Sequence, residues 1–375
     1  MKTETMIMRQ TKNVLLSVCF IVKNESDKIE NLLLVVKKFA DEIVVVDTGS
    51  TDGTTEISKK HADVFAEFKW VNDFSAARNY AFSLANGKYL MWLDADDAIT
   101  DENVEKIKRL KSNLIADVYM AKYSCGLNSA GKPSLTYFRE RIIKNCEKAR
   151  FSGRVHEAVV PFGRVEYADF EVEHRKKESG ASRRNLNIYL YAKKRGEKFS
   201  PRDVYYMGKE YYYLNLFYSA KITLKKFLKT NGDNRNFRDA YITLYKCETE
   251  ILKENRSEKQ NDSALKYLFC ALKRFGADGE LLCLIADFYR MRGDKSRAKD
   301  YYKCALALKK PIDKGAFLYE KYYYYVPLMW LTVLCYETGE LSDALFYHNK
   351  CLKAYPSDVS VIRNDEFFKK IVQKS

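Results

Sequence analysis

The first half of the chain alternates short apolar runs with helical patterns, and this alternation constrains the fold more than any other feature. Four runs predict buried strands: residues 14–22, 42–47, 63–68 and 88–94. Three segments with helical patterning lie between them: residues 26–40, 54–62 and 73–87. Continuous apolar strands separated by helices predict an α/β domain whose parallel sheet is covered on both faces.

Acidic residues stand at the ends of two of these predicted strands. Asp47 closes the second run, and Asp94 closes the fourth. In open parallel sheets, ligands bind outside the carboxyl ends of the strands. We therefore expect a ligand site at the edge of the sheet where Asp47 and Asp94 lie.

The pattern changes after residue 117. Residues 117–125 and 134–145 predict strands of a mixed or antiparallel extension. Residues 151–165 predict a loop and strand region, and this region holds the adjacent pair His156 and Glu157. Beyond it the chain becomes helical and rich in Tyr, Leu, Ala and Lys.

An internal repeat runs through this helical half. Alanines recur at equivalent positions of its units, 44, 34 and 46 residues apart: Ala220, Ala264, Ala298 and Ala344. A regular tetratricopeptide array would keep a spacing of about 34 residues, so this set is degenerate and carries insertions. Helical hairpins that bury small residues against one another predict a curved all-α solenoid. We expect the alanines and the tyrosine-rich run 321–327 to pack between hairpins.

Positive charge is concentrated in the second half of the chain. Residues 1–175 hold 26 Lys and Arg against 26 Asp and Glu, whereas residues 176–375 hold 39 against 24. Such a bias favours an acidic partner, nucleic acid or a membrane surface, or it marks a Lys-rich solvated helical surface. We favour the solvated surface and expect no nucleic acid partner, because the tyrosines look packed rather than free to stack on bases.

Cysteine usage and the first apolar run bear on the compartment. The nine cysteines include no Cys-x-x-Cys pair, which predicts reduced thiols rather than a disulfide framework or a zinc site. The run 14–22 lacks a small-residue cleavage site, so it predicts a strand rather than a signal core. No segment of the sequence is long and apolar enough to span a membrane, and we expect a cytoplasmic protein.

Three carboxylates follow the fourth predicted strand in the stretch "YLMWLDADDAIT". Asp94 and Asp96 have the Asp-x-Asp (DxD) spacing at which one hard cation can bridge two carboxylates and a diphosphate. The alternative is a turn followed by the N-cap of a helix, although Thr100 or Asp101 would cap that helix better. By itself, the motif favours neither interpretation.

Five motifs in order shift this balance. They are "FIVKNE", "VVVDTGSTDGT", "NDFSAARN", "LDADD" and "FSGRVHEAVVP", and together they cover roughly residues 15–174. This half resembles the family 2 glycosyltransferases, which are inverting enzymes of GT-A (Rossmann-like) fold that use nucleotide sugars. The helical half resembles that of a branch carrying tetratricopeptide-like repeats, which includes bacteriocin peptide glycosyltransferases and enzymes of cell-surface glycans.

The resemblance implies roles for individual residues. It places eight of them around the nucleotide sugar: Val22, Lys23, Asn24, Glu25, Asp47, Arg78, Asp94 and Ala95. Many family members carry two acids in a row after the second strand, whereas this chain has Asp47-Thr48, which leaves the nucleobase open. Asp52 is expected to order its own turn.

The resemblance also implies a metal site and a general base. It assigns Asp96 and His156 to Mg²⁺ or Mn²⁺, and Glu157 to the acceptor proton. From the residues alone, a loop histidine and a surface glutamate are the better interpretations of His156 and Glu157. Arg78 suits a phosphate or an ion pair with the Asp-x-Asp carboxylates, or it locks a helix to a strand. Asp97 is expected to be structural, and His174 is a further candidate for the pyrophosphate side.

These expectations describe a two-domain enzyme. Residues 13–178 form the glycosyltransferase domain and residues 179–375 the repeat domain. The chain is expected to transfer a hexose from a nucleotide sugar, UDP-sugar in the first place, to a peptide side chain or a cell-surface glycan. A homodimer could form through the repeats. The alternative is a non-catalytic scaffold that combines a sugar-nucleotide domain with a repeat domain.

Overall fold

The structure is a computed structural model, and it describes residues 13–127, 133–175, 182–254, 262–309 and 319–373. The chain divides into two compact units, one of residues 1–123 and 138–177 and one of residues 124–137 and 178–375. The predicted domain boundary between residues 178 and 179 lies outside the described residues and stays a prediction.

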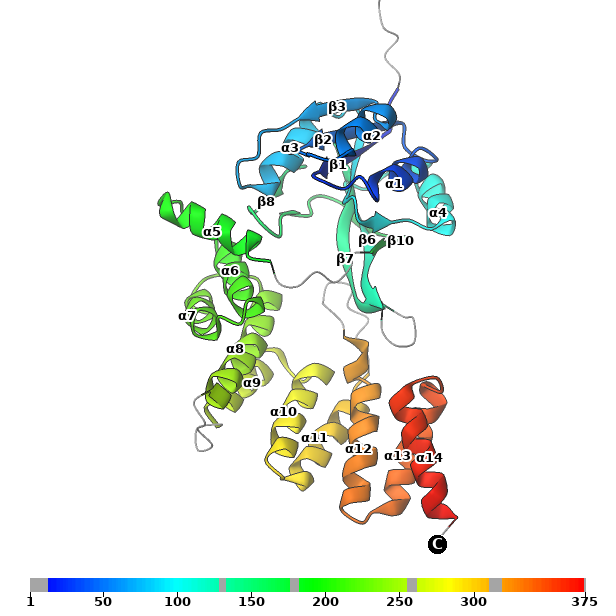
Figure 1. The fold of residues 1–375 in the computed structure, drawn as a ribbon, viewed down its shortest axis with the longest axis vertical. Helices are drawn as coiled ribbons and strands as arrows, with labels where there is room; N and C mark the ends of the chain where they lie inside the picture. The colour runs from blue at the N-terminus through cyan, green and yellow to red at the C-terminus, as the bar shows by residue number, and fades with distance from the viewer. Residues whose placement is uncertain (1–12, 128–132, 176–181, 255–261, 310–318, 374–375) are drawn as a thin grey trace, which may run out of the picture. The chain divides into compact units, whose positions relative to one another are not determined.

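The first unit is built around a parallel sheet, as the sequence predicts (Figure 1). Its strands are β1 (Leu16–Val22), β2 (Glu42–Asp47), β3 (Val64–Glu67) and β4 (Tyr89–Leu93). The register pairs Val22 with Asp47 and Phe20 with Leu93, so the carboxyl ends of β1, β2 and β4 meet at one edge. These strands form because nearly every side chain in β1, β2 and β4 is buried, which continuous apolar runs permit.

An antiparallel extension continues this sheet. The strand order is β3-β2-β1-β4-β7-β6-β10-β5, and β8 pairs with β9 separately. The added strands are β5 (Asp97–Ala98), β6 (Val118–Leu127), β7 (Pro133–Lys144), β8 (Phe151–Ser152), β9 (Ala158–Val159) and β10 (Val165–His174). Antiparallel pairing of β7 with β4 confirms the predicted mixed sheet. Antiparallel pairing of β10 with β5 sets His174 opposite Asp97, which the sequence did not indicate.

Four helices complete the first unit: α1 (Ile29–Val36), α2 (Thr54–His61), α3 (Phe74–Leu84) and α4 (Asp101–Lys111). Asp73 caps α3 by accepting a hydrogen bond from the amide of Ala76. Thr100 caps α4, and Asp97 lies in β5. The three acids after β4 are therefore not the cap of that helix, and the structure removes the N-cap interpretation of the Asp-x-Asp motif.

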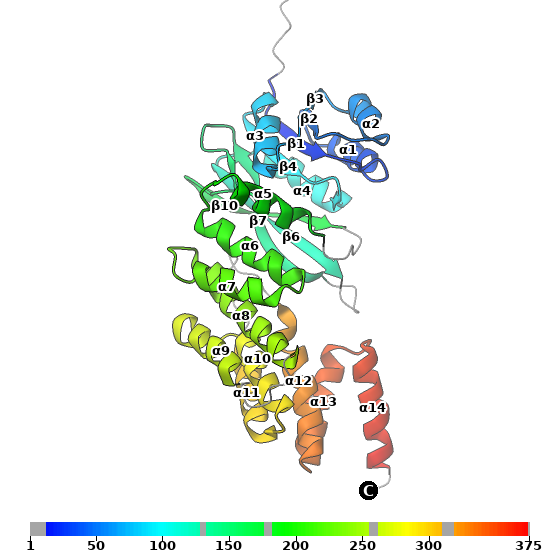
Figure 2. The ribbon, with the colours of Figure 1, turned by 60° about the vertical axis from the view of Figure 1, so that its left-hand side comes forward.

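The second unit is an array of helical hairpins (Figure 2). Its helices are α5 (Arg184–Lys194), α6 (Pro201–Tyr213), α7 (Phe217–Phe227), α8 (Asn234–Glu254), α9 (Asp262–Phe275), α10 (Gly279–Met291), α11 (Lys295–Ala307), α12 (Tyr325–Glu337), α13 (Leu341–Ala354) and α14 (Val359–Val372), with a short 3-10 helix, η2 (Glu320–Tyr322), before α12. Helices pair in sequence order from α6 with α7 to α12 with α13. The four repeat alanines are at most 1% exposed, so the predicted packing role is confirmed.

Close approach between paired helices depends on small residues. A Cβ atom at Gly208 of α6 would lie 2.6 Å from Cδ2 of Leu224 in α7. The tyrosine-rich run also contacts a neighbouring helix. Tyr323 is buried, and the carbonyl of Tyr322 accepts a hydrogen bond from Cys283 in α10. All nine cysteines are free thiols. Within the described part of the chain, none of the helices has the length and apolarity needed to cross a membrane.

Candidate active site

The loops after β1 and β2 are tied together at the carboxyl edge of the sheet. The amide of Asn24 donates to the Ser50 hydroxyl at 3.0 Å, and the Asn24 side chain accepts from the amide of Thr51 at 2.8 Å. Asn24 has a φ of 55°, a left-handed backbone that asparagine tolerates better than most residues. Glu25 is held through its amide to Thr54. The predicted pocket wall at residues 23–25 is therefore an ordered loop after β1.

Asp47 organises the turn that follows β2. One of its oxygens accepts from the amides of Gly49 and Ser50 at 2.9 and 2.8 Å, and the other accepts from the Thr55 hydroxyl at 2.6 Å. Asp52 accepts from Thr54 within the same turn, as the sequence predicts. The predicted contact of Asp47 with the nucleotide stays a prediction, and this carboxylate shapes the loop in any case.

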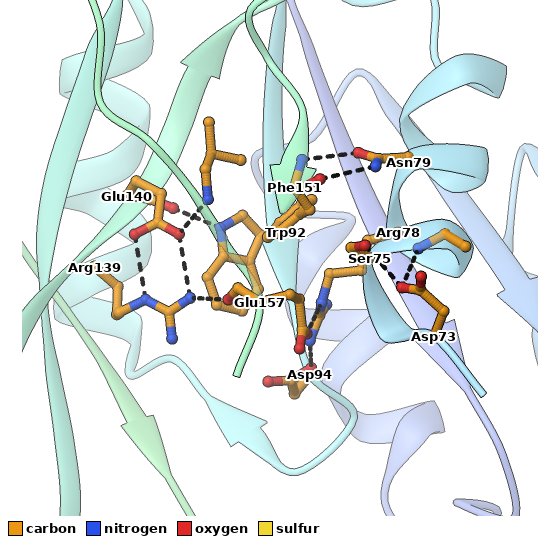
Figure 3. Close-up of polar contacts among 12 residues, drawn as sticks. Asp73, Ser75, Arg78, Asn79, Trp92, Asp94, Arg139, Glu140, Phe151 and Glu157 are labelled. Carbon is orange, nitrogen blue, oxygen red and sulfur yellow. Dashed lines mark hydrogen bonds and ion pairs between the residues drawn. The ribbon is translucent and has the colours of Figure 1, made fainter. Parts of the chain in front are cut away.

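Arg78 joins two acids that lie far apart in the sequence (Figure 3). Its Nη2 donates to Asp94 Oδ1 and its Nε donates to Glu157 Oε1, both at 2.6 Å. The guanidinium also lies 4.7 Å from the Trp92 ring and 5.4 Å from the Phe151 ring. Burial alone would raise the pKa of Asp94, but the charge of Arg78 outweighs it and holds this pKa below its usual range. Both carboxylates are thus fixed by one buried cation.

The backbone around Glu157 is held by neighbouring residues of β7 (Figure 3). Arg139 Nη2 donates to the carbonyl of Glu157 at 3.0 Å, and Glu140 Oε1 accepts from the amide of Val159 at 3.1 Å. Arg139 and Glu140 also pair with each other, at 3.1 and 3.2 Å. The indole of Trp92 donates to the carbonyl of Glu140. Arg139 and Glu140 are site residues that the sequence did not identify.

Helix α3 anchors the other side of the Glu157 loop. The side chain of Asn79 exchanges hydrogen bonds with the backbone of Phe151 at 2.8 and 3.0 Å. The amide of Phe74 donates to the carbonyl of Arg154 at 2.9 Å, and Arg154 lies 3.5 Å from the Asp73 carboxylate. This explains the "NDFSAARN" motif locally, since Asp73, Arg78 and Asn79 each hold part of the segment that carries Glu157.

Asp97 has a structural role, in agreement with the sequence. Its carboxylate accepts from the amide of Asp94 at 3.0 Å and from the Tyr123 hydroxyl at 2.7 Å. Arg141 lies 3.3 Å from it and is fully buried between the rings of Trp92 and Tyr123. A buried charge needs a partner of opposite charge, and Arg141 and Asp97 serve as partners for each other.

Asp96 and His174 form the part of the site suited to a cation. His174 Nδ1 lies 3.4 Å from Asp96 Oδ1 and 3.5 Å from Asp97 Oδ1, and this buried nitrogen makes no hydrogen bond within the described residues. Burial, together with the charges of Asp94 and Asp97, raises the pKa of Asp96. Burial lowers the pKa of His174, but Asp97 and Asp96 outweigh it and raise this pKa. The cluster therefore attracts positive charge.

Two groups in the described parts of the chain bring three potential metal ligands within reach of one ion. One consists of Asp96, Asp97 and His174, and the other of Cys335, Glu340 and Asp343. His156 belongs to neither group, and its predicted role as a metal ligand stays a prediction. The structure instead groups His174 with Asp96 and Asp97 as potential metal ligands. The sequence indicated His174 only as a candidate for the pyrophosphate side.

Comparisons with known proteins show what the chain is similar to. Residues 17–156 match the model of the family described as glycosyl transferase family 2. The glycosyltransferase SunS of Bacillus phage SPbeta is 30% identical over 246 residues, which are 60% of this chain and 56% of the relative. A TPR repeat-containing protein of Synechococcus elongatus is 33% identical over 144 residues, 38% of this chain and 35% of that protein. The chain thus spans about half the length of SunS and about a third of the length of the Synechococcus protein.

Solved structures resemble the chain more distantly. S. aureus TarS in complex with UDP-GlcNAc is 16% identical, with a TM-score of 0.39 over 82% of this chain and 96% of that chain. A TPR protein of Thermus thermophilus is 19% identical, with a TM-score of 0.35 over 48% of this chain and 87% of that one. Scores of this size assign no role to any residue.

Proposed function

Residues 17–156 form a family 2 glycosyltransferase domain that tetratricopeptide-like helical repeats follow, and we propose that the chain is a metal-dependent, inverting glycosyltransferase. One observation carries the proposal: Asp94, Arg78 and Glu157 converge at the carboxyl edge of the sheet, beside the Asp96 and His174 cluster. The residues proposed for the donor, the cation and the base therefore lie together at the edge where ligands bind in such sheets.

The donor set at the cation site fits Mg²⁺ or Mn²⁺. Carboxylate oxygens suit both ions, and an imidazole nitrogen is acceptable to Mn²⁺. Asp96 and His174 would hold the ion, and the buried Nδ1 without a hydrogen bond is the feature that supports this assignment. When bound, such an ion neutralises the negative charge that develops on a departing nucleoside diphosphate.

The protein's own residues divide the remaining work. Glu157 is the proposed base, and its Oε2 makes no hydrogen bond within the described residues, whereas Oε1 is held by Arg78. Glu157 Oε2 would accept the proton of the attacking acceptor group, while the anomeric carbon inverts. Arg78 holds Glu157 and Asp94 in one fixed geometry, which keeps the base aligned with the donor site. This modifies the predicted contact of Arg78 with phosphate, because two of its donors are already engaged by carboxylates.

The donor is proposed to be a UDP-sugar, bound along Val22 and the ordered loop of residues 23–25 with Asp47, Asp94 and Ala95. The acceptor is proposed to be a peptide side chain or a cell-surface glycan. The alternative, a non-catalytic scaffold, requires that the site has decayed. The complete set of Asp96, His174, Arg78 and Glu157 argues against decay.

A donor panel assayed by release of nucleoside diphosphate tests the proposal. Wild type is compared, with and without Mn²⁺, with Glu157→Gln, Asp96→Asn and a control, Asp169→Asn, whose carboxylate is almost fully exposed on the same unit. We expect chelation and Asp96→Asn to abolish release, and Glu157→Gln to slow transfer by about 10²- to 10⁴-fold, the usual contribution of a general base. Equal rates for wild type and Asp96→Asn would show that the site assignment is wrong.

A further inference from the structure

Helices α5, α6 and α7 lie at the amino-terminal end of the repeat unit (Figure 2). Residues of these helices and of the loop after α5 line a groove. The groove has a volume of about 360 Å³. Val204, Met207 and Tyr211 of α6 and Ile222 of α7 line it with apolar surface, and Lys193 and Lys226 stand at its rims. We refer to these six residues as the α5–α7 groove.

The spacing of the lining residues matches the footprint of a helix. Val204, Met207 and Tyr211 follow one another at i, i+3 and i+7 along α6. On α7, Ile222 and Lys226 continue the same pattern at i and i+4. Residues at such spacing form a single stripe on a helix, and a stripe of this kind is normally covered by another helix.

The place of the groove in the array supports a helical occupant. Each hairpin of a repeat array covers its neighbour, and terminal repeats need a polar outer face or a cap. Helix α7 packs against α6 and α8 through Ala220, Leu224 and Phe227, all fully buried. Its groove side is different, because Ile222 is 58% exposed. Helix α5 packs on α6, yet it leaves Ile222 of α7 open.

The charges of the residues that line the groove indicate what kind of ligand it can bind. Lys193 and Lys226 are exposed, and neither has an ion-pair partner among the described residues. The acid that lines the groove, Glu197, is paired with Arg195 at 3.3 Å. The groove therefore presents uncompensated positive charge on both sides of an apolar floor. An occupant with acidic flanks would neutralise both rims, whereas a second copy of this chain, with a net charge of +15, would be repelled.

We propose that the α5–α7 groove binds an acidic amphipathic helix of another polypeptide. The apolar stripe of that helix covers Val204, Tyr211 and Ile222, and its carboxylates face Lys193 and Lys226. This is the helix-in-groove mode of peptide recognition, in which apolar anchors supply affinity and flanking charges select the partner. The proposal is independent of the glycosyltransferase site, because every residue that carries it lies in the repeat unit.

The test uses the full-length protein and designed peptides in fluorescence anisotropy titrations. The probe is about 18 residues long, roughly five helical turns, with leucines at i, i+3, i+4 and i+7 and glutamates elsewhere. One comparison peptide has lysines in place of the glutamates, and another has the acidic composition in scrambled order. We expect the ordered acidic peptide to bind, and the two comparison peptides to bind at least about tenfold more weakly, which corresponds to about 1.4 kcal/mol.

Variants of the protein locate the binding. Lys193→Glu with Lys226→Glu is expected to weaken binding of the acidic probe at least about tenfold, since both rim charges become repulsive. The matched control is Lys225→Glu with Lys229→Glu, which makes the same change of charge at exposed lysines outside the groove lining. Ile222→Asp, at a position that is 58% exposed, is expected to abolish binding.

Several outcomes would overturn the proposal. They are failure of the acidic probe to bind at up to millimolar concentration, equal binding of acidic and basic probes, and equal losses in the groove and control variants. Sedimentation velocity tests the remaining alternative, in which a second copy of the chain occupies the groove. A wild-type dimer that Ile222→Asp converts to a monomer would show that the groove holds a second copy of the chain instead.

Discussion

The edge of the sheet in the first unit and the hairpin contacts of the second unit are held together by opposite means. At the edge of the sheet, charged groups are buried in pairs: Arg78 with Asp94 and Glu157, and Arg141 with Asp97. Within the helical hairpins, the closest contacts are made by the repeat alanines and by Gly208, whereas ion pairs such as Lys209 with Asp239 join one hairpin to the next. The buried ion pairs are destabilised when one partner is removed. The hairpin contacts are destabilised when an atom is added.

The difference fits the catalytic role proposed for the first unit and the packing role of the hairpin contacts. Buried ion pairs repay little of their desolvation cost, so stability alone does not require them. They do fix the positions of carboxylates, which a site that binds a donor and accepts a proton needs. Apolar contacts between hairpins only have to match in shape, and small residues satisfy that requirement over many similar units.

The largest effect is expected from Arg78→Met, which removes the shared cation. The loss in free energy of unfolding of the first unit should be about 3 kcal/mol, near the lower end for a broken buried pair because Asp94 stays partly exposed. Urea unfolding followed by tryptophan fluorescence in a Trp330→Phe background reports on the first unit, since Trp92 packs against Arg78.

The triple variant Arg78→Met, Asp94→Asn, Glu157→Gln is the matched control for this prediction. If uncompensated negative charge causes the loss, neutralising both acids should recover most of the stability, although transfer should remain slow because Glu157→Gln removes the proposed base. Equal instability of the single and triple variants would attribute the loss to packing against Trp92 and Phe151 instead.

Arg139→Gln should affect rate more than binding. The substitution removes the hydrogen bond to the carbonyl of Glu157 and leaves the Arg78 contacts in place. A hydrogen bond to a charged group contributes about 1.5–3 kcal/mol, so kcat should fall roughly 10- to 100-fold while the KM for the donor changes little. Steady-state kinetics with both substrates varied provide the measurement.

Two comparisons make the Arg139 result specific. Arg139→Lys should restore only part of the rate, because an ammonium group lacks the fork that contacts Glu140 and Glu157 together. Arg164→Gln removes an exposed arginine paired with Glu166 and should leave both constants unchanged. A rise in KM with unchanged kcat would contradict a positioning role for Arg139.

Gly208→Ala tests the close contacts within the helical hairpins of the second unit. The new methyl group would lie 2.6 Å from Cδ2 and 2.7 Å from Cγ of Leu224, whose side chain is fully buried. Overpacking of this kind costs about 1–3 kcal/mol. Hydrogen exchange of α6 and α7 under increasing urea measures the loss locally, and the activity of the first unit should not change.

A double-mutant cycle with Leu224→Ala tests the cause. Leu224→Ala alone should cost about 2–5 kcal/mol through the cavity that it leaves. If the two side chains clash, the double variant should be more stable than the sum of the single effects by at least about 0.5 kcal/mol. Strict additivity would mean that the added methyl group acts on the helix backbone rather than on Leu224.

The elements of both units could be predicted from the sequence because their patterns are local. Apolar runs placed β1, β2 and β4 within one or two residues, and the repeat spacing placed the four buried alanines. Which strands pair, and in which register, depends on contacts between distant segments. The pairing of β10 with β5, which sets His174 opposite Asp97 and near Asp96, was therefore not predictable from residue spacing.

The site was predicted in part for the same reason. An ion pair of Arg78 with the Asp-x-Asp acids was among the expected roles, and Asp94 is its partner. Its second partner, Glu157, lies 79 residues away, and no local pattern links them. Arg139, Glu140 and Arg141 did leave a signal, since three consecutive charges interrupt an otherwise apolar strand. Buried charges need partners, so that run pointed to a polar network.

The smallest effect is expected from Ser200→Ala, which removes a contact that the local sequence encodes completely. The Ser200 hydroxyl accepts from the amide of Asp203 at 3.2 Å, and the Asp203 carboxylate accepts from the amide of Ser200 at 3.0 Å. Loss of such a cap costs about 1 kcal/mol, which should speed exchange of the amides of α6 about fivefold. Ser200→Thr keeps the hydroxyl and should retain most of the protection. Equal exchange in the two variants would mean that α6 is held by its packing on α7 and that the cap contributes nothing measurable.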